Sequence, residues 1–205
     1  MYGGDGFLKS EIQKSEIQKI IKTFKTDLTQ YAKHCLKIVD KQGKLISLEL
    51  NAAQQLLDSQ IQEQYAHHKR VRMLILKSRQ TGISTYCQAR GFWKTVSAQN
   101  QNAVVVSHLN ESTKAIFSMV RNFYDNLPHP VVTPELKEST SNSMAFTHGS
   151  RWRIATARTG EVGRGWTTNY LHGSEVAFYP NADIIPGLLQ TVPEAESEIL
   201  LESTA

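Results

Sequence analysis

The stretch Met73–Thr85, MLILKSRQTGIST, joins an apolar strand, a short polar loop and the start of a helix. A strand, a loop with a glycine and a Ser-Thr pair that opens a helix form the context of a phosphate-binding loop. The backbone N–H groups and the dipole of a helix N-terminus favour an anion. Gly82 permits close approach of the backbone to a β-phosphate, and Ser84 falls where a phosphate-loop hydroxyl binds Mg²⁺. The stretch therefore predicts a nucleotide phosphate site.

The loop departs from the usual pattern, G-x-x-x-x-G-K-[ST], at two positions. Ile83 stands where the pattern has lysine, and Lys77 replaces its first glycine. Lys77 or Arg79 can supply the missing cation, because either side chain is long enough to fold back over a triphosphate. The residues expected around the phosphates are Lys77, Ser78, Arg79, Gln80, Thr81, Gly82, Ile83, Ser84 and Thr85. Taken alone, the loop fits an ordinary strand–helix connection equally well.

Helical and strand patterns alternate on both sides of the loop. The apolar spacing from Ile17 to Leu28 predicts a surface helix that packs on the core, and Asn51 is placed to cap a helix. The further helices are expected at Ala52–Tyr65, Thr85–Ala98, Glu111–Asn126 and Asn181–Leu189. The strands are expected at Val71–Leu76, Ala103–Ser107, Met144–Thr147 paired with Arg151–Thr156, Tyr170–Leu171 and Glu198–Leu201. This alternation indicates a three-layer α/β domain with a largely parallel sheet.

Composition limits the class of protein without deciding it. A chain of 205 residues with 40% hydrophobic content is long enough for one sizeable core. The 23 basic and 19 acidic residues give a net charge of +4, which is compatible with a polyanionic partner and equally with none. Cys35 and Cys87 form no CxxC pair, so buried, reduced thiols are expected.

Other site types find little support in the sequence. Seven histidines form no HExxH pair, and solvent-facing or helix-terminal positions are expected for them. The basic run Lys69–Arg72 fits either a solvated strand entry or contact with DNA phosphates. The sequence has neither a secretory signal pattern nor an apolar run near the roughly 18 residues that span a bilayer. A soluble, intracellular protein is therefore expected.

The loop resembles the displaced-lysine Walker A motif of large terminase subunits, the ATP-driven motors that package phage DNA into procapsids. Three further segments follow the order of that family. Leu50–Gln54 resembles its adenine-recognition element, in which the Gln54 amide would both donate to and accept from the adenine edge. Tyr170–Tyr179 resembles the Walker B segment, and Leu200–Ala205 resembles the coupling motif.

The resemblance assigns roles to individual residues. Glu175 would polarise the attacking water, and Ser174 stands where the family normally has an aspartate that holds Mg²⁺. Ser203 and Thr204 would sense the γ-phosphate. The metal site would comprise Ser84 and Ser174.

A glycine-rich segment before the Walker B motif carries two arginines. Arg164, in Gly163-Arg-Gly165, would act as an arginine finger, with Arg158 as the alternative. Such a residue reaches a phosphate of its own subunit or of a neighbour. Surface pairing with carboxylates is the competing interpretation of both arginines.

The resemblance implies a P-loop NTPase of the ASCE type with helices on both sheet faces. It divides the chain into an N-terminal helical extension, residues 1–49, and an ATPase domain, residues 50–205, which we expect to be truncated and without the family's nuclease domain. ATP and Mg²⁺ are the implied cofactors. The implied partners are double-stranded DNA, the portal protein, the small terminase subunit and further copies in a ring, in the host cytoplasm.

Two other functions stay open. The absence of lysine at position 83 and of aspartate at position 174 also fits a nucleotide-binding or assembly module that hydrolyses little ATP. A helicase-like ATPase shares the order of motifs, but it normally has a standard Gly-Lys-Thr loop and a second motor domain.

Overall fold

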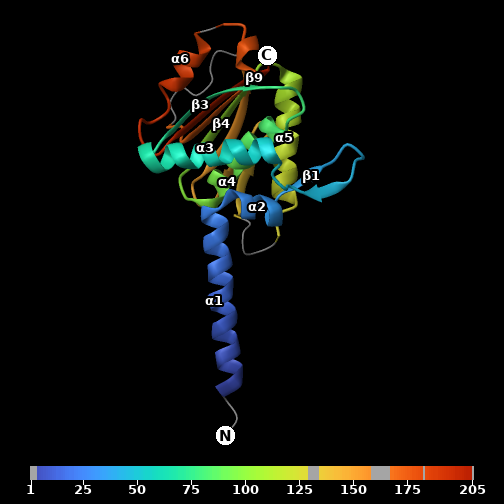
Figure 1. Ribbon diagram of the computed structural model, residues 1–205, viewed down its shortest axis with the longest axis vertical. Coiled ribbons are helices and arrows are strands. Elements are labelled where there is room, and N and C mark those ends of the chain that lie inside the picture. The colour runs from blue at the N-terminus through green and yellow to red at the C-terminus, as the bar shows by residue number, and fades with distance from the viewer. Residues whose placement is uncertain (1–3, 129–133, 158–166, 182, 205) are drawn as a thin grey trace.

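A mostly parallel sheet crosses the centre of the protein, shown in Figure 1 as a computed structural model that describes residues 4–128, 134–157, 167–181 and 183–204. In this part of the chain the sheet has seven strands, in the order β3-β9-β8-β4-β7-β6-β5. Their bounds are β3 Val71–Lys77, β4 Asn102–Ser107, β5 Leu136–Ser139, β6 Ser143–Phe146, β7 Arg151–Thr156, β8 Tyr170–Ser174 and β9 Glu198–Thr204. The five strands from β3 to β7 in this order are parallel, and β6 and β5 are antiparallel additions.

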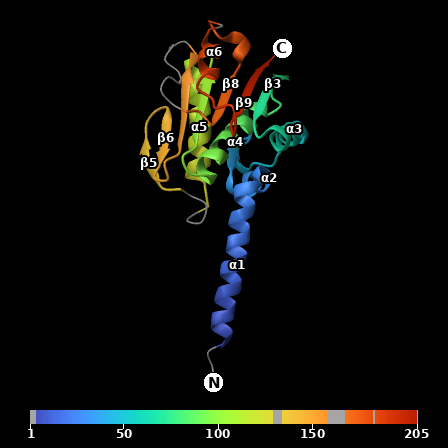
Figure 2. The same ribbon diagram turned by 90° about the vertical axis from the view of Figure 1, so that its left-hand side faces the viewer.

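Each sheet face packs against its own set of helices, which gives the expected three layers (Figure 2). Helices α3 (Ala52–His68), α4 (Ile83–Ser97) and α5 (Asn110–Asp125) cover one face. Helix α6 (Ile184–Leu189) covers part of the other, where its Leu188 belongs to a separate apolar cluster. Strand β4 explains why the two clusters stay separate. Its Val105 belongs to the first and its Val104 and Val106 to the second, as period-2 alternation in a doubly covered strand requires.

The N-terminal elements extend the larger cluster. Helix α2 (Leu28–Cys35) begins after Asp27, whose carboxylate accepts a hydrogen bond from the Gln30 N–H, and it buries Tyr31 and Cys35. The hairpin of β1 (Lys37–Val39) and β2 (Leu45–Ser47) turns at Gly43. Residues 28–48 thus share a core with residues expected in the ATPase domain. The boundary at residues 49 and 50 remains a prediction.

Helix α1 (Gly4–Thr26) projects from the body at the end opposite the C-terminus (Figure 1). The expectation of one helix packed on the core through Ile17–Leu28 is wrong in two respects. The helix ends before Asp27, and the side chains of Ser15–Ile20 are exposed. The apolar period is present, but only its last turn, at Phe24, reaches the core.

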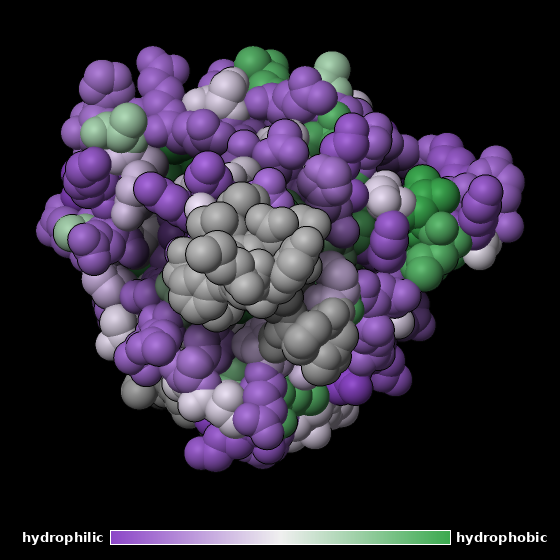
Figure 3. All heavy atoms as spheres, turned by 90° about the horizontal axis from the view of Figure 1, so that it is seen from below, coloured by the Kyte–Doolittle hydropathy of each residue, from purple (hydrophilic) through white to green (hydrophobic). Residues whose placement is uncertain are grey.

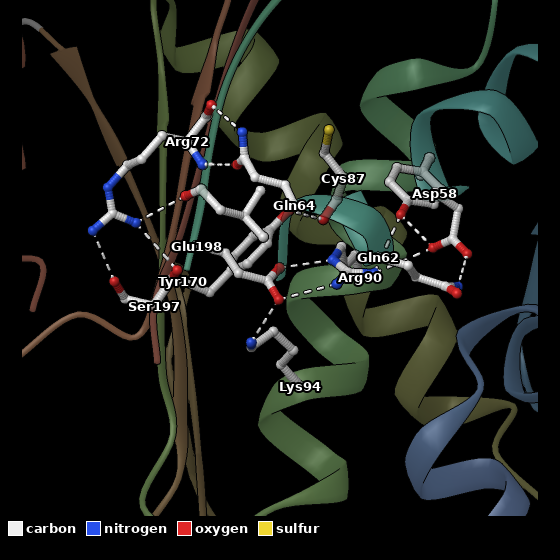
Figure 4. Close-up of polar contacts among 12 residues, drawn as sticks. Asp58, Gln62, Gln64, Arg72, Cys87, Arg90, Lys94, Tyr170, Ser197 and Glu198 are labelled. Atoms are coloured by element: carbon white, nitrogen blue, oxygen red, sulfur yellow. Dashed lines mark hydrogen bonds and ion pairs between the residues drawn. The ribbon is translucent and has the colours of Figure 1, made fainter. Parts of the chain in front are cut away.

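A network of buried charges lies near the amino ends of the parallel strands (Figure 4). The Arg90 guanidinium donates to both carboxylate oxygens of Glu198, at 2.7 and 3.0 Å, and to Asp58 at 3.2 Å. Lys94 donates to Glu198 at 2.8 Å. Burial raises the pKa of the Glu198 carboxyl, but the Arg90 and Lys94 charges outweigh it and lower the pKa to about 2. The network therefore ties α3, α4 and β9 together.

The surface seen from below, along α1, is mainly hydrophilic, and its hydrophobic residues form small separate groups (Figure 3). Among the described residues, the helices are too short or too polar to cross a bilayer. Cys35 and Cys87 are both free and buried, as expected.

The elements next to the phosphate loop follow the sequence predictions within a few residues. Asn51 caps α3, and the pairing of β6 with β7 confirms the expected hairpin. Strand β5 was not expected, because its residues are mostly polar and exposed. Strand β9 continues three residues beyond the expected end at Leu201, and this extension bears on the site.

Candidate functional site

The loop Ser78–Gly82 connects the carboxyl end of β3 to the first turn of α4. Gln80 and Gly82 have left-handed backbones, with φ of 61° and 76°. Gly82 is the N-cap of α4 and supplies no side-chain cap, so the N–H groups of the first turn stay available to an external acceptor. The geometry is that of an anion-binding loop.

Side chains at the start of helix α3 fix the position of this loop by hydrogen bonds. Gln54 is buried, its Oε1 accepts from the Asn51 N–H at 2.9 Å, and its Nε2 donates to the Gly82 carbonyl at 2.7 Å. The Asn51 side chain donates to the Thr81 carbonyl at 3.0 Å. Both ends of the Gln54 amide are thus engaged within the protein. Its role in adenine recognition remains a prediction, whereas the structure shows that it fixes the position of the phosphate loop.

Lys77, the last residue of β3, lies beside the carboxylates of two other strand ends. Its Nζ is 2.8 Å from Glu175 Oε1 and 3.1 Å from Glu202 Oε2, and its side chain is 9% exposed. Burial lowers the pKa of the Lys77 ammonium, but the hydrogen bond with Glu175 and the Glu202 charge outweigh it and raise the pKa. Ile83 is buried and cannot reach a ligand. The cation beside the loop is therefore presented by Lys77 and not by the residue at position 83.

Glu175 follows β8 and is held by three hydrogen bonds. Besides the Lys77 contact, its Oε2 accepts from the backbone N–H of Thr204 at 3.1 Å and from the Thr204 hydroxyl at 3.0 Å. Its backbone is left-handed, with φ 56°, a strained conformation for a non-glycine residue. Burial raises the pKa of the Glu175 carboxyl, but Lys77 and Thr204 together lower it. Glu175 is therefore an ionised carboxylate at the loop.

Glu202 is the site residue that sequence reasoning missed. It lies on β9, between β3 and β8, and its side chain is fully buried. The hydroxyls of Ser84 and Ser174 both donate to Glu202 Oε1, each at 2.9 Å. Burial raises the pKa of the Glu202 carboxyl, but contacts with His172, Lys77 and Ser84 lower it to about 2. A carboxylate that is ionised at neutral pH thus lies behind the phosphate loop.

A buried histidine adjoins Glu202. His172 Nε2 is 3.5 Å from Glu202 Oε1, and its Nδ1 is 2.7 Å from Gln88 Nε2. The expectation that the histidines lie in solvent or at helix ends is wrong for His172, because it sits on the α4-facing side of the central strand β8. His172 and Glu202 could both have been suspected from the period of two in a strand. This period puts His172 on the same face as Ser174, and Glu202 on the same face as Leu200.

Ser203 and Thr204 do not share one environment. Thr204 contacts Glu175, whereas Ser203 lies on the opposite face of β9, since successive strand residues point to opposite faces. The Ser203 hydroxyl is 3.3 Å from the Thr204 carbonyl. The cavity lining includes Thr204 but not Ser203. The expected roles of both residues at the phosphates remain predictions, and only that of Thr204 is supported by its position. Arg158 and Arg164 lie outside the described residues.

A cavity of about 560 Å³ opens at this end of the sheet. Its lining includes Lys77, Arg79, Ser84, Glu175 and Thr204. Arg79 is exposed at its rim, and Ser78, Thr81 and Thr85 complete the loop and first turn without lining it. Another hollow, of about 500 Å³, lies near Arg90 and Trp93 at the other end of α4. The first brings the phosphate-type loop together with Lys77, Ser84 and Glu175, so it is the candidate nucleotide site.

The described residues contain no group of three or more His, Cys, Asp or Glu side chains that could hold a metal ion without further ligands. A phosphate loop does not require one, because its Mg²⁺ is bound mainly by phosphate oxygens, water and one hydroxyl. Ser84 and Ser174 both lie at the cavity, and both contact an ionised carboxylate. The residues present therefore fit a nucleotide-bound Mg²⁺.

Comparisons by sequence identify no relative: no protein-family model matches the chain, and neither does any curated protein. Comparison of structures is informative. The large terminase of bacteriophage HK97 matches 87% of the chain with a TM-score of 0.70 at 11% identity. A mutant ATPase domain of the Thermus phage P74-26 large terminase matches 75% with a TM-score of 0.58 at 15% identity. The large terminase of a further thermophilic bacteriophage matches 76% with a TM-score of 0.56 at 9% identity.

The chain spans 37%, 64% and 39% of the lengths of these three proteins. At such low identity the likeness concerns the fold. The chain therefore has the α/β fold of these large terminases, with a mostly parallel central sheet between helices.

Proposed function

We propose that this chain is the ATPase motor domain of a viral large terminase subunit, which couples ATP hydrolysis to the translocation of double-stranded DNA into a procapsid. One observation carries the proposal. Lys77, Ser84 and Glu175, from three separate segments, meet at one cavity at the carboxyl ends of the strands. Ligands of open α/β sheets bind in this place, and the likeness to large terminases gives the same fold.

The phosphate loop would hold the β-phosphate through the N–H groups of the first turn of α4. Lys77 then exchanges its contact with Glu175 for the γ-phosphate, because a phosphate offers it more negative charge than one carboxylate. Arg79, exposed at the cavity rim, is the second candidate for that cation. Ser84 would contribute its hydroxyl to Mg²⁺, which neutralises charge on the phosphates.

The departure of Lys77 frees Glu175 Oε1, which then accepts a hydrogen bond from the attacking water and orients it. Oε2 stays bound to Thr204, so the carboxylate keeps its direction. Through this contact, loss of the γ-phosphate would reach β9, which is the proposed route to DNA movement. DNA, portal, small-subunit and ring contacts, and an arginine finger at Arg164 or Arg158, belong to this proposal.

The test measures ADP binding and ATP hydrolysis of the purified chain, with and without double-stranded DNA. Lys77→Ala, Arg79→Ala and Glu175→Ala are compared with Lys33→Ala, an exposed lysine paired with Glu49. We expect Lys77→Ala to weaken nucleotide binding and Glu175→Ala to abolish hydrolysis, while Lys33→Ala leaves both unchanged. A wild-type hydrolysis rate that survives all three site substitutions would overturn the motor function.

A nucleotide-binding module with little hydrolysis is the second candidate. The observation that favours it is that both carboxylate oxygens of Glu175 already have partners, Lys77 on Oε1 and Thr204 on Oε2, which compete with an attacking water. In that case the wild-type chain binds ADP and ATP, and ATP remains intact even when DNA and a high protein concentration are supplied.

A further inference from the structure

The carboxylate normally expected at position 174 is present one strand away. In the parallel pair β8–β9, Ser174 and Glu202 are direct register partners. Both side chains lie on the sheet face that carries α4, as their shared contact shows: the Ser174 hydroxyl donates to Glu202 Oε1 at 2.9 Å. A carboxylate on β9 at this level is also next to β3, from which the phosphate loop departs.

The hydrogen bond between the Ser84 hydroxyl and Glu202 indicates the role of this carboxylate. Its proton is donated to Glu202 Oε1 at 2.9 Å, so the oxygen lone pairs of Ser84 remain available to a cation. Ser84 lines the cavity, whereas Glu202 lies behind it and is fully buried. This arrangement is that of a metal-binding hydroxyl oriented by a carboxylate behind it.

The charges around Glu202 leave a place for a further cation. Lys77 is the one ammonium or guanidinium that the described residues bring within 4 Å of Glu175 and Glu202. Glu202 Oε2 is buried and has no hydrogen bond with suitable geometry, only the 3.1 Å ion contact with Lys77. When Lys77 turns to a phosphate, Glu202 keeps its contacts with Ser84, Ser174 and His172 but loses its ammonium partner, and a buried charge that loses such a partner is costly. A divalent cation at Ser84 removes this cost.

We propose that Glu202 is the positioning residue of the Mg²⁺ site, in place of the aspartate that the resemblance predicts at position 174, and that it acts through the Ser84 hydroxyl. This inference rests on the proposed nucleotide site. The competing view is that Glu202 only neutralises Lys77 in the resting protein. The two views differ in what Glu202→Gln changes. If Glu202 positions the metal site, Glu202→Gln weakens the binding that depends on metal. If Glu202 only neutralises Lys77, Glu202→Gln changes nucleotide binding in the absence of metal.

The experiment measures ADP affinity by titration calorimetry in Mg²⁺ and in EDTA, and Mn²⁺ affinity in the presence of ADP by electron paramagnetic resonance. We expect Glu202→Gln to weaken Mn²⁺ binding by about 10- to 100-fold, the usual effect of removing a residue that orients a metal ligand. Ser84→Ala should have a similar effect, and combining the two should add little, because both act through one hydroxyl.

Two variants keep the test decisive. Ser174→Asp combined with Glu202→Gln returns the carboxylate to β8 and should recover most of the lost Mn²⁺ affinity. Glu198→Gln is the matched control, because Glu198 is a buried carboxylate on the same face of β9 but pairs with Arg90 and Lys94. It should reduce stability without changing the Mn²⁺ affinity of the folded protein.

The outcomes separate this inference from the proposed function. If the wild-type chain binds no ADP in Mg²⁺ or in EDTA, the nucleotide site itself is wrong. If the wild type binds ADP with Mg²⁺, but Glu202→Gln keeps the wild-type Mn²⁺ affinity, the inference is overturned and the nucleotide site stands. Should Glu202→Gln not fold, Ser84→Ala and Ser84→Ala with Ser174→Asp decide: unchanged Mn²⁺ affinity in both contradicts the metal role of Ser84.

Discussion

Glu175 combines a left-handed backbone with a carboxylate whose two oxygens both accept hydrogen bonds. Glu175→Gln preserves the size of the side chain and can still accept from Thr204, but it removes the charge that would orient and deprotonate water. We expect ATP binding to persist and hydrolysis to fall by about 10²- to 10⁴-fold, the range for loss of a general base. Phosphate release and nucleotide titration measure the two quantities. Glu194→Gln, at an exposed carboxylate paired with Arg70, is the control, and a variant that binds no ATP would contradict the assigned role.

Gly82 is required by its conformation and by its surroundings. Its φ is 76°, and a Cβ there would lie 2.8 Å from Gln54 Nε2. Gly82→Ala therefore strains the backbone and displaces the amide that holds the loop, at a cost of about 1–3 kcal/mol. We expect a lower urea midpoint and weaker ADP binding. Gly187→Ala is the control, since its Cβ meets open space in α6. Equal stability of the two variants would show that the loop tolerates the Cβ.

At the level of elements, the sequence predicts the strand, loop and helix of the candidate phosphate site well because their determinants are contiguous. The apolar run of β3, Gly82 and the Ser-Thr pair lie within thirteen residues, and each acts on its own neighbourhood. Strand β9 is different. The polar residues from Glu202 onward end the apolar run, so the sequence predicts an end at Leu201. In the structure they continue the strand because β3 and β8 pair with it on both sides.

The same contrast explains which site residues were found. Lys77 and Ser84 were identified from the loop, and Glu175 from the segment that resembles a Walker B motif. Glu202 was missed because its meaning depends on which strand lies beside β8, and strand order is not written in local spacing. Ser203 was assigned to the site because two adjacent hydroxyls look equivalent in a sequence, whereas a strand sends them to opposite faces.

The Glu198 network predicts how stability depends on pH. The folded-state pKa of Glu198 is lowered from the ordinary 4.5 to about 2, so its contribution is complete above pH 4.5 and is lost as the pH falls toward 2. Wild-type stability should therefore decline between pH 5 and pH 3 in urea unfolding experiments. Glu202, with a similarly low pKa, contributes to the same decline.

Glu198→Gln removes one titrating group. The free energy of unfolding should then fall less steeply with decreasing pH, by up to about 1.4 kcal/mol per pH unit. At pH 7 the variant should lose about 3 kcal/mol, because Arg90 and Lys94 are left without their shared carboxylate. Arg90 keeps its contact with Asp58, so the fold should survive. An unchanged pH profile would mean that Arg90 and Lys94 do not lower the pKa of Glu198.

At the scale of the whole molecule, α1 and the candidate site lie at opposite ends. Gly82 caps the N-terminus of α4, whereas Trp93, near the other end of α4, donates to the Phe24 carbonyl of α1 at 2.7 Å. Trp93 lies 11 residues after Gly82, which is a rise of about 16 Å along the helix. A change at the phosphates would therefore reach α1 only through α4 and the layers packed around it.

The exposure of α1 gives a prediction about truncation. Deletion of residues 1–19 removes the exposed side chains of Ser15–Lys19 together with the residues before them, and should change the free energy of unfolding by less than about 1 kcal/mol. Deletion of residues 1–26 also removes Phe24, which packs edge-on against Tyr31 with ring centroids 6.2 Å apart. This deletion should cost about 2 kcal/mol more, from one partly buried aromatic group and one hydrogen bond.

The free energy of unfolding of both deletion variants is measured by urea unfolding, with tryptophan fluorescence as the signal. Trp93 lies beside the segment that differs between the two variants. If the shorter deletion is as destabilising as the longer one, residues 1–19 contribute packing that a single chain does not provide. The loss would then depend on protein concentration, because a contact between copies stabilises by mass action. A concentration-independent loss would instead place the missing contacts within the chain, and the projection of α1 from the body would be wrong.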